Sequence, residues 1–195
     1  MNGARRIAAV FWALCIGVAA CSCIHQNSAA SSNSNKGADA RIAAKVYIFV
    51  NNDCPIANRY SPEIRRLYEQ YAPRGVAFWL VHCDPQETEA GVREHNQQYS
   101  LTLPIIMDRD QSLARRCRAE VVPSASVFSD QGGLVYHGRI DDRLAEIGRE
   151  RPQPSRHDLA EALDAILTHR PVAVAETRAV GCYISNVPRL SQQTR

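Results

Sequence analysis

The stretch that most constrains the fold is an uninterrupted apolar run, residues 46–50 (VYIFV), which leads within four residues to a Cys-Pro pair. β-Branched and aromatic residues without polar alternation are typical of a strand buried on both faces of a sheet. From Pro55 onward, apolar residues recur at helical spacing as far as Tyr71, and proline is favoured in the first turn of a helix. The sequence therefore predicts a buried strand that turns into a long helix, with Cys54 at the helix N-cap.

A cysteine in this position is a candidate nucleophile. It faces the unpaired N–H groups and the positive end of the helix dipole, and both stabilise the thiolate, which is the reactive form. Asn51, Asp53 and Pro55 are its neighbours in the predicted site. The alternative is that Cys54 is a small buried residue that closes the corner between strand and helix.

The rest of the chain alternates between strand and helix patterns. We expect a second buried strand over residues 76–81, parallel to the first because a helix connects them. An exposed helix is predicted over 84–99, a short extended piece over 104–108 and a short helix over 110–118. The segment 121–128 is expected to enter a strand after Pro123. This strand and residues 134–137 are expected to form a hairpin around the Gly-rich turn over 130–133. The last predicted element is an amphipathic helix that a capping box over 155–158 opens and that ends before Pro171.

The first twenty residues have a basic start and a short apolar stretch that ends in small residues, the form of a secretory signal. Residues 18–21 (VAAC) also resemble the bacterial lipobox, which implies lipidation of Cys21 and attachment to a membrane on the exported side. The alternatives are simple cleavage after Ala20 and a retained N-terminal anchor. Residues 21–44 have the composition of a flexible tether. We therefore expect a domain over 45–170 and a C-terminal tail over 171–195 that carries Cys182.

Composition excludes some classes of function. The net charge is +3 and 45% of the 195 residues are hydrophobic, which fits one ordinary globular domain rather than a nucleic-acid-binding protein. His82 and Cys83 could join Cys54 in a copper site, but a histidine in a buried strand is more often a hydrogen-bonded core residue, and we predict no metal or cofactor. Asp141 and Asp142 could be an acid–base pair, although solvated loop residues paired with nearby arginines are the simpler interpretation.

The order of elements and several motifs resemble the thioredoxin superfamily. The Cys54-Pro55 corner resembles the active-site corner of thioredoxins and peroxiredoxins, and Val122-Pro123 resembles the cis-proline that faces it. Residues 138–143 (GRIDDR), the closing helix and residues 180–184 (VGCYI) are similar to a bacterial peroxiredoxin-like, redoxin-domain (AhpC/TSA-like) branch. The resemblance implies a thioredoxin-like α/β fold, a central mixed sheet with helices on both faces, and Cys182 as the resolving partner of Cys54.

Several positions differ from the motifs of these families, and the differences favour thiol exchange over peroxide reduction. Ala57 stands where a Cys-x-x-Cys motif has its second cysteine, and Asn51 and Tyr47 stand where peroxiredoxins have threonine and proline. No arginine adjoins Val122-Pro123, and peroxide reduction needs such donors to polarise the O–O bond. Thiol exchange needs only a thiolate, access and a second sulfur.

The second sulfur cannot be assigned from spacing alone. The resemblance favours Cys182. Cys83 ends the second predicted strand at the sheet edge where Cys54 emerges, and Cys54 could also have no internal partner. Cys117 is interpreted as a packing residue.

The sequence therefore predicts an exported, membrane-tethered thiol-disulfide oxidoreductase with Cys54 as nucleophile. Its partners would be protein or small-molecule thiols and disulfides, and Pro123 would line the groove that receives them. A thiol peroxidase and a non-catalytic binding module with a structural disulfide are the alternatives.

Overall fold

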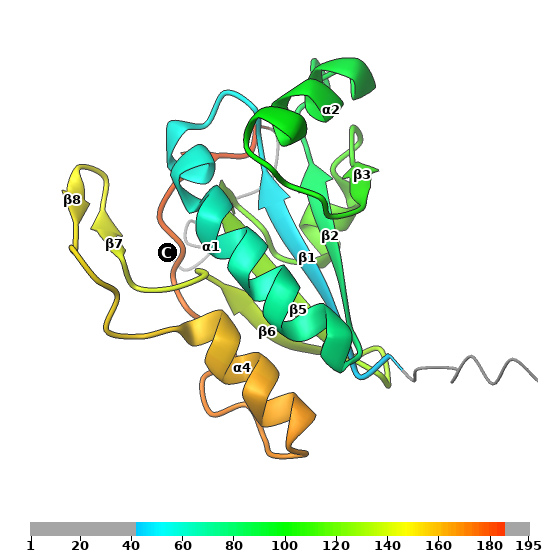
Figure 1. Ribbon diagram of the computed structural model, residues 1–195, viewed down its shortest axis with the longest axis vertical. Coiled ribbons are helices and arrows are strands. Elements are labelled where there is room, and N and C mark those ends of the chain that lie inside the picture. Colours follow the sequence, from blue (N-terminus) through cyan, green and yellow to red (C-terminus); the bar gives the residue numbers. More distant parts are fainter. Residues whose placement is uncertain (1–41, 186–195) are drawn as a thin grey trace, which may run out of the picture. The chain divides into compact units, whose positions relative to one another are not determined.

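The computed structural model describes residues 42–185, which lie within one compact unit of the chain. The centre of that unit is a five-stranded mixed sheet with the strand order β3-β2-β1-β5-β6 (Figure 1). Its strands are β1 (Ala44–Val50), β2 (Val76–His82), β3 (Ile105–Met107), β5 (Ser124–Ser129) and β6 (Leu134–Gly138). β1, β2 and β3 run parallel, whereas β5 is antiparallel to both β1 and β6. The predicted parallel pair and the predicted hairpin are both confirmed.

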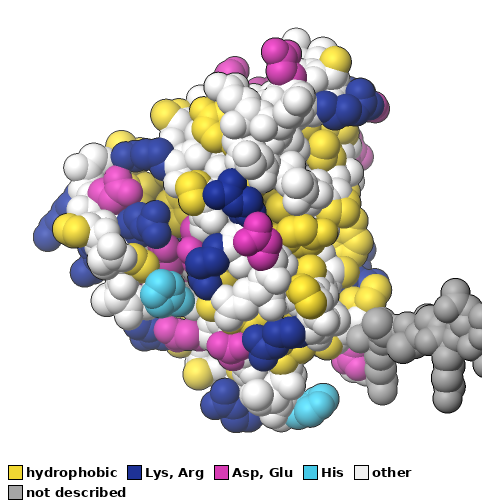
Figure 2. All heavy atoms as spheres, viewed as in Figure 1, with side chains coloured by type: hydrophobic (Ala, Val, Ile, Leu, Met, Phe, Trp, Pro, Cys, Tyr) yellow, Lys and Arg dark blue, Asp and Glu magenta, His cyan; other side chains and the backbone are white. Residues whose placement is uncertain are grey.

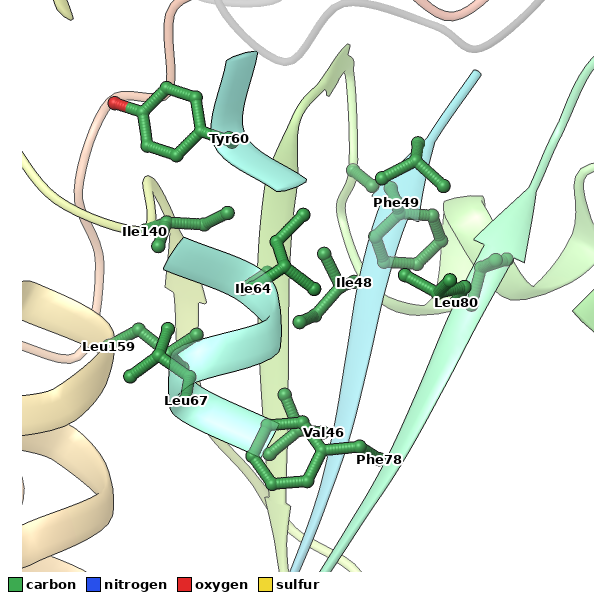
Figure 3. Close-up of a cluster of buried hydrophobic side chains, with 14 of the residues drawn as sticks. Val46, Ile48, Phe49, Tyr60, Ile64, Leu67, Phe78, Leu80, Ile140 and Leu159 are labelled. Carbon is green, nitrogen blue, oxygen red and sulfur yellow. The ribbon is translucent and has the colours of Figure 1, made fainter. Parts of the chain in front are cut away.

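One face of the sheet is covered by α1 (Pro55–Tyr71) and α4 (Asp158–Leu167) (Figure 1). Ile64 of α1 lies beside Ile48 of β1, and Leu67 lies beside Leu159 of α4 (Figure 3). Val46 of β1 belongs to the same core. Each of these five side chains is at most 1% exposed. Their burial removes several large apolar groups from water, which is the main favourable contribution to folding. This core fixes the direction in which α1 leaves the sheet.

The opposite face carries an aromatic layer, because successive side chains on a strand point to opposite sides. Tyr47 of β1 stacks on Trp79 of β2 at a centroid distance of 5.3 Å and meets Phe128 edge-on. The guanidinium of Arg116, which belongs to α3 (Ser112–Arg116), lies 5.4 Å from the centre of the Phe128 ring. Helical residues thus lie on both faces of the sheet, as predicted. Tyr47 is only half-buried, so β1 is enclosed on both faces only in its last residues.

The remaining elements are short. They are the 3-10 turn η1 (Ala72–Arg74), α2 (Glu89–Gln98), β4 (Val121–Val122), β7 (Leu144–Glu146), β8 (Arg149–Glu150) and β9 (Cys182–Tyr183). α2 begins later than the predicted helix over 84–99, because Thr88 caps it by accepting a hydrogen bond from the Gly91 amide. β7 and β8 form a small hairpin that the sequence did not predict, and β9 pairs with β4. The Val122–Pro123 peptide bond between β4 and β5 is cis, as expected.

The predicted capping box of the last helix was wrong. α4 begins at Asp158 with His157 at its N-cap, and the His157 side chain makes no capping hydrogen bond. The Ser155 hydroxyl instead donates to Asp142, and the Asp158 carboxylate pairs with Arg139 at 2.7 Å. The pattern of a capping box was present, but tertiary partners took both of its polar side chains.

Positive and negative side chains are interspersed over the face in Figure 2, which agrees with the small net charge. None of the described helices is long and apolar enough to cross a membrane. The predicted signal segment 1–20, the candidate lipidation residue Cys21 and nearly all of the predicted tether lie outside the described residues.

Candidate functional site

Cys54 is the N-cap of α1, as predicted. The Ala57 amide donates to Cys54 Sγ at 3.5 Å, while the Cys54 carbonyl accepts the first helical hydrogen bond from Asn58 at 3.0 Å. Pro55 occupies the first helical turn, where its missing N–H costs nothing. The sulfur is therefore held at the positive end of the helix, a setting that stabilises a thiolate.

The turn before Cys54 is shaped by Asn51. Its side-chain oxygen accepts from the Asp53 amide at 2.9 Å, and its carbonyl accepts from the Cys54 amide at 3.2 Å. The Asn51 amide group also donates to Asp84, which follows β2, at 3.4 Å. Asp53 itself is exposed. These contacts make Asn51 a structural organiser of the turn and place Asp53 at its surface.

A buried glutamate, Glu87, is hydrogen-bonded to the same turn, and the sequence analysis did not predict this role. Glu87 Oε1 accepts from the Asn52 amide at 2.6 Å, and Glu87 Oε2 lies 2.9 Å from His82 Nδ1. The Glu87 side chain is 7% exposed and His82 is fully buried. The interpretation of His82 as a hydrogen-bonded core residue is confirmed. Glu87 lay in a predicted exposed helix, so no pattern in the sequence marked it as buried.

Cys182 lies directly against Cys54. The two sulfur atoms are 2.6 Å apart, and the Cys54 thiol is also 3.4 Å from the carbonyl oxygen of Val122. Both cysteines are free thiols, with Cys54 2% exposed and Cys182 half-buried. Two sulfurs at this separation can form a disulfide with only a small shift of either side chain. Cys54, Pro123 and Cys182, which are far apart in the sequence, thus meet at one place.

Strand pairing holds Cys182 in this position. β9 lies antiparallel to β4, with Cys182 opposite Val122 and Tyr183 opposite Val121. Gly181 approaches the Val122–Pro123 peptide closely, since a Cβ atom at Gly181 would be 2.0 Å from the Val122 oxygen. No other residue type fits at position 181 without movement of the backbone.

The other described cysteines are in less reactive surroundings. The Cys83 thiol contacts Asp108 Oδ2 at 3.8 Å, and burial together with the charge of Asp108 raises its pKa. Burial also raises the pKa of Cys117 to about 12, and this residue is fully buried, as expected of a packing residue. The pKa of Cys182 is raised to about 11 by burial and by the neighbouring Cys54 sulfur. The raised pKa therefore keeps the Cys182 thiol protonated at neutral pH.

The expectation that Asp141 and Asp142 are solvated was wrong, because they are only 1% and 5% exposed. Asp141 accepts hydrogen bonds from the Tyr60 hydroxyl at 2.7 Å and from the Arg143 amide at 2.9 Å. Asp142 accepts from the backbone amides of residues 155 and 156 and from the Ser155 hydroxyl. The motif over 138–143 thus ties α1 and the segment before α4 to the sheet.

Another group of acidic side chains and a histidine comes close together among the described residues. Glu63, Asp141 and His157 offer possible metal ligands within 4.8 Å of one another. However, Glu63 is already held by Arg66 at 2.6 Å, and Asp141 by Tyr60. Glu63 and Asp141 therefore belong to hydrogen-bonded charge networks of their own.

We expect Asp142→Ala to lower the free energy of unfolding at pH 7 by about 2–4 kcal/mol, since three hydrogen bonds are lost. Burial raises the pKa of the Asp142 carboxyl, but the hydrogen bonds from Ser155 and Arg156 outweigh it and lower the pKa to about 2. A lowered pKa contributes stability above the ordinary value of about 4, and this stability is lost as the pH falls toward 2.

Urea denaturation between pH 7 and pH 2 would measure this effect. The difference between wild type and Asp142→Ala should shrink as the pH falls through that window. Ser155→Ala, which removes one of the three bonds, should give a smaller loss at pH 7. Equal stability of wild type and Asp142→Ala at pH 7 would contradict the structural role.

The sheet order, the cysteine at the start of α1 and the cis-proline beside it define a thioredoxin-like protein. The chain belongs to the AhpC/TSA family, whose model matches residues 29–137. It is 24% identical over 103 residues to the thiol-disulfide oxidoreductase ResA of Halalkalibacterium halodurans. That match covers 52% of this chain and 57% of ResA, so the chain spans little more than half the length of this relative.

Two solved structures extend the likeness in fold. An uncharacterized conserved protein from Geobacillus kaustophilus is 26% identical, with a TM-score of 0.64 over 75% of this chain and 79% of its own. A putative thioredoxin from Neisseria meningitidis is 17% identical, with a TM-score of 0.52 over 68% of this chain and 79% of its own. The predicted thioredoxin-like α/β fold and the predicted family are both confirmed.

Proposed function

We propose that this chain is a thiol-disulfide oxidoreductase in which Cys54 is the nucleophile and Cys182 the resolving cysteine. The observation that carries the proposal is the 2.6 Å separation of the two sulfur atoms beside the cis-proline. The second sulfur that exchange chemistry requires is thus within bonding reach of the first.

The reaction begins with attack of the Cys54 thiolate on one sulfur of a partner disulfide. A bond forms between Cys54 and that sulfur, and the partner's other sulfur leaves as a thiolate and takes up a proton. Cys182 then loses its proton and attacks Cys54 Sγ, which displaces the partner's remaining sulfur as a second thiolate. The partner has gained two electrons, and the protein holds a Cys54–Cys182 disulfide that an external dithiol reduces again.

The surroundings of each sulfur support these roles. Cys54 receives a hydrogen bond from the Ala57 amide at the start of α1, which favours the anionic nucleophile. The raised pKa of Cys182 keeps its proton in place until a mixed disulfide has replaced the negative charge on Cys54. This order prevents Cys182 from competing for the partner in the first step.

The name of the relative ResA agrees with this activity, and the sequence features near Cys21 support an exported protein held at a membrane by a lipid. In such a compartment a dedicated reductant would have to keep the pair reduced. Protein disulfides or small-molecule disulfides would be the substrates.

Reaction of the reduced protein with glutathione disulfide, followed by alkylation and mass mapping, would test the proposal. In the wild type we expect a transient glutathione adduct at Cys54 and then a Cys54–Cys182 disulfide without retained glutathione. In Cys182→Ser the adduct should persist, because no internal thiol resolves it. Cys83→Ala should behave like the wild type.

Adducts at Cys83, or no reaction at Cys54, would overturn the proposal. A Cys54–Cys182 bridge with a reduction potential below about −300 mV would instead favour a structural disulfide in a non-catalytic module. Rapid consumption of hydrogen peroxide that depends on Cys54 would favour the thiol peroxidase.

A further inference from the structure

The segment that delivers Cys182 also covers the backbone edge beside the proposed nucleophile. β9 pairs with both residues of β4, and the Ile184 amide donates to the carbonyl of Glu120 at 2.9 Å. Val122, the residue opposite Cys182, also accepts the hydrogen bond from Cys54. A partner cysteine that approached Cys54 as an extended strand would need this same edge.

β9 shows which side chains this edge accepts. Cys182 and Ile184 point inward, with Ile184 8% exposed and part of the apolar core, whereas Tyr183 points outward and is 57% exposed. The position before the cysteine is restricted most, because a Cβ atom there would overlap the Val122 carbonyl. The four successive positions of a strand bound at this edge thus take glycine, then cysteine, then any residue, and then an apolar residue.

There is room for a strand to enter and leave. A cleft of about 860 Å³ borders the β4–β9 pair, and its lining includes Val121, Gly181 and Tyr183. The pair consists of two residues on each side, so few hydrogen bonds hold β9 in place. The contact between the two sulfurs is its closest link to the rest of the site.

We propose that the β4 edge selects partner disulfides whose cysteine lies in an extended Gly-Cys-x-apolar segment, and that β9 is an internal copy of this substrate. The inference rests on the proposed function and specifies its substrate class. The partner strand and β9 compete for one edge. Binding of the partner therefore requires β9 to leave, and the return of β9 brings Cys182 to the mixed disulfide and expels the partner.

Peptides that copy residues 179–185 (AVGCYIS) provide the test. Each peptide carries thionitrobenzoate on its cysteine. Attack of Cys54 on the peptide sulfur breaks that disulfide, forms a Cys54–peptide bond and releases the coloured thiolate. Two protein variants are compared. Cys182→Ser lacks the internal thiol. The double variant Gly181→Ala, Cys182→Ser also carries an added Cβ, which weakens the pairing of β9 with β4.

We expect the parent peptide to react with both variants at least about tenfold faster than the peptide with Gly→Ala before its cysteine, because the added methyl group would overlap the Val122 carbonyl. Ile→Ser in the peptide should also cost about tenfold through lost apolar burial, whereas Tyr→Ser should change little. The double variant should react faster with the parent peptide than Cys182→Ser does. Rates are divided by those with free glutathione, which corrects for the intrinsic reactivity of each peptide.

Equal normalised rates for the parent and the Gly→Ala peptide in the double variant, where β9 no longer blocks the edge, would overturn the inference. Reaction of Cys54 with glutathione disulfide in the same variant shows that the proposed function still holds in that case. If Cys54 reacts with neither, the proposed function has failed as well.

Discussion

Cys54→Ser is expected to slow the reaction of the reduced protein with a small aromatic disulfide by about 10³-fold or more. A hydroxyl does not replace a thiolate as the attacking group, and removal of a covalent nucleophile leaves only background reaction. The raised pKa values of Cys83 and Cys117 keep these buried thiols protonated, so they do not take over the fast reaction. The release of the coloured thiolate in a stopped-flow experiment measures the effect.

This variant separates chemistry from folding. Serine is a favourable N-cap residue, so Cys54→Ser should keep the start of α1 and unfold at nearly the same urea concentration as the wild type. Cys117→Ala, at a fully buried packing position, is the matched control and should keep the fast phase. A fast phase that survives in Cys54→Ser would mean that another cysteine is the nucleophile.

Gly181→Ala is expected to slow closure of the Cys54–Cys182 disulfide by about 100-fold. The new methyl group would lie 2.0 Å from the Val122 oxygen, so β9 must move away from β4 and carry Cys182 with it. A displacement of about 1 Å from reacting geometry can cost a factor of 10² in rate. The measurement is the decay of the glutathione adduct on Cys54, followed by rapid acid quench and mass spectrometry.

The first step, formation of that adduct, should not slow in Gly181→Ala, because Cys54 and α1 remain in place. Gly133→Ala in the turn between β5 and β6 is the matched control, since its added Cβ would make only an ordinary contact of 3.8 Å with Ser129 Oγ. An unchanged rate of disulfide closure in Gly181→Ala would show that the close pairing of β9 with β4 does not position Cys182.

Most of the fold was predicted from sequence patterns that extend over only a few residues. The apolar run of β1, the proline at the start of α1 and the Gly-rich turn between β5 and β6 each act over a few residues, and all three elements formed as predicted. The capping box before α4 failed for the opposite reason. Ser155 had a stronger partner in Asp142, which is nearby only in the folded chain.

The candidate site likewise has features that local sequence determines and features that depend on distant segments. The placement of Cys54 at a helix N-cap follows from residues 46–58 and was predictable. The burial of Glu87 beneath the Asn52 amide and the burial of Asp141 were not, because both depend on elements that are distant in the sequence.

By itself the sequence determined the succession of strands and helices and the placement of Cys54 at the start of α1. Apolar periodicity and the geometry of proline act within a single element, so they can be recognised without the tertiary structure. Only the tertiary structure decided which cysteine lies against Cys54. That choice depends on the pairing of a two-residue strand, β9, with β4 and on a backbone contact that glycine alone permits. Contacts between segments this far apart arise only when the packed sheet brings them together.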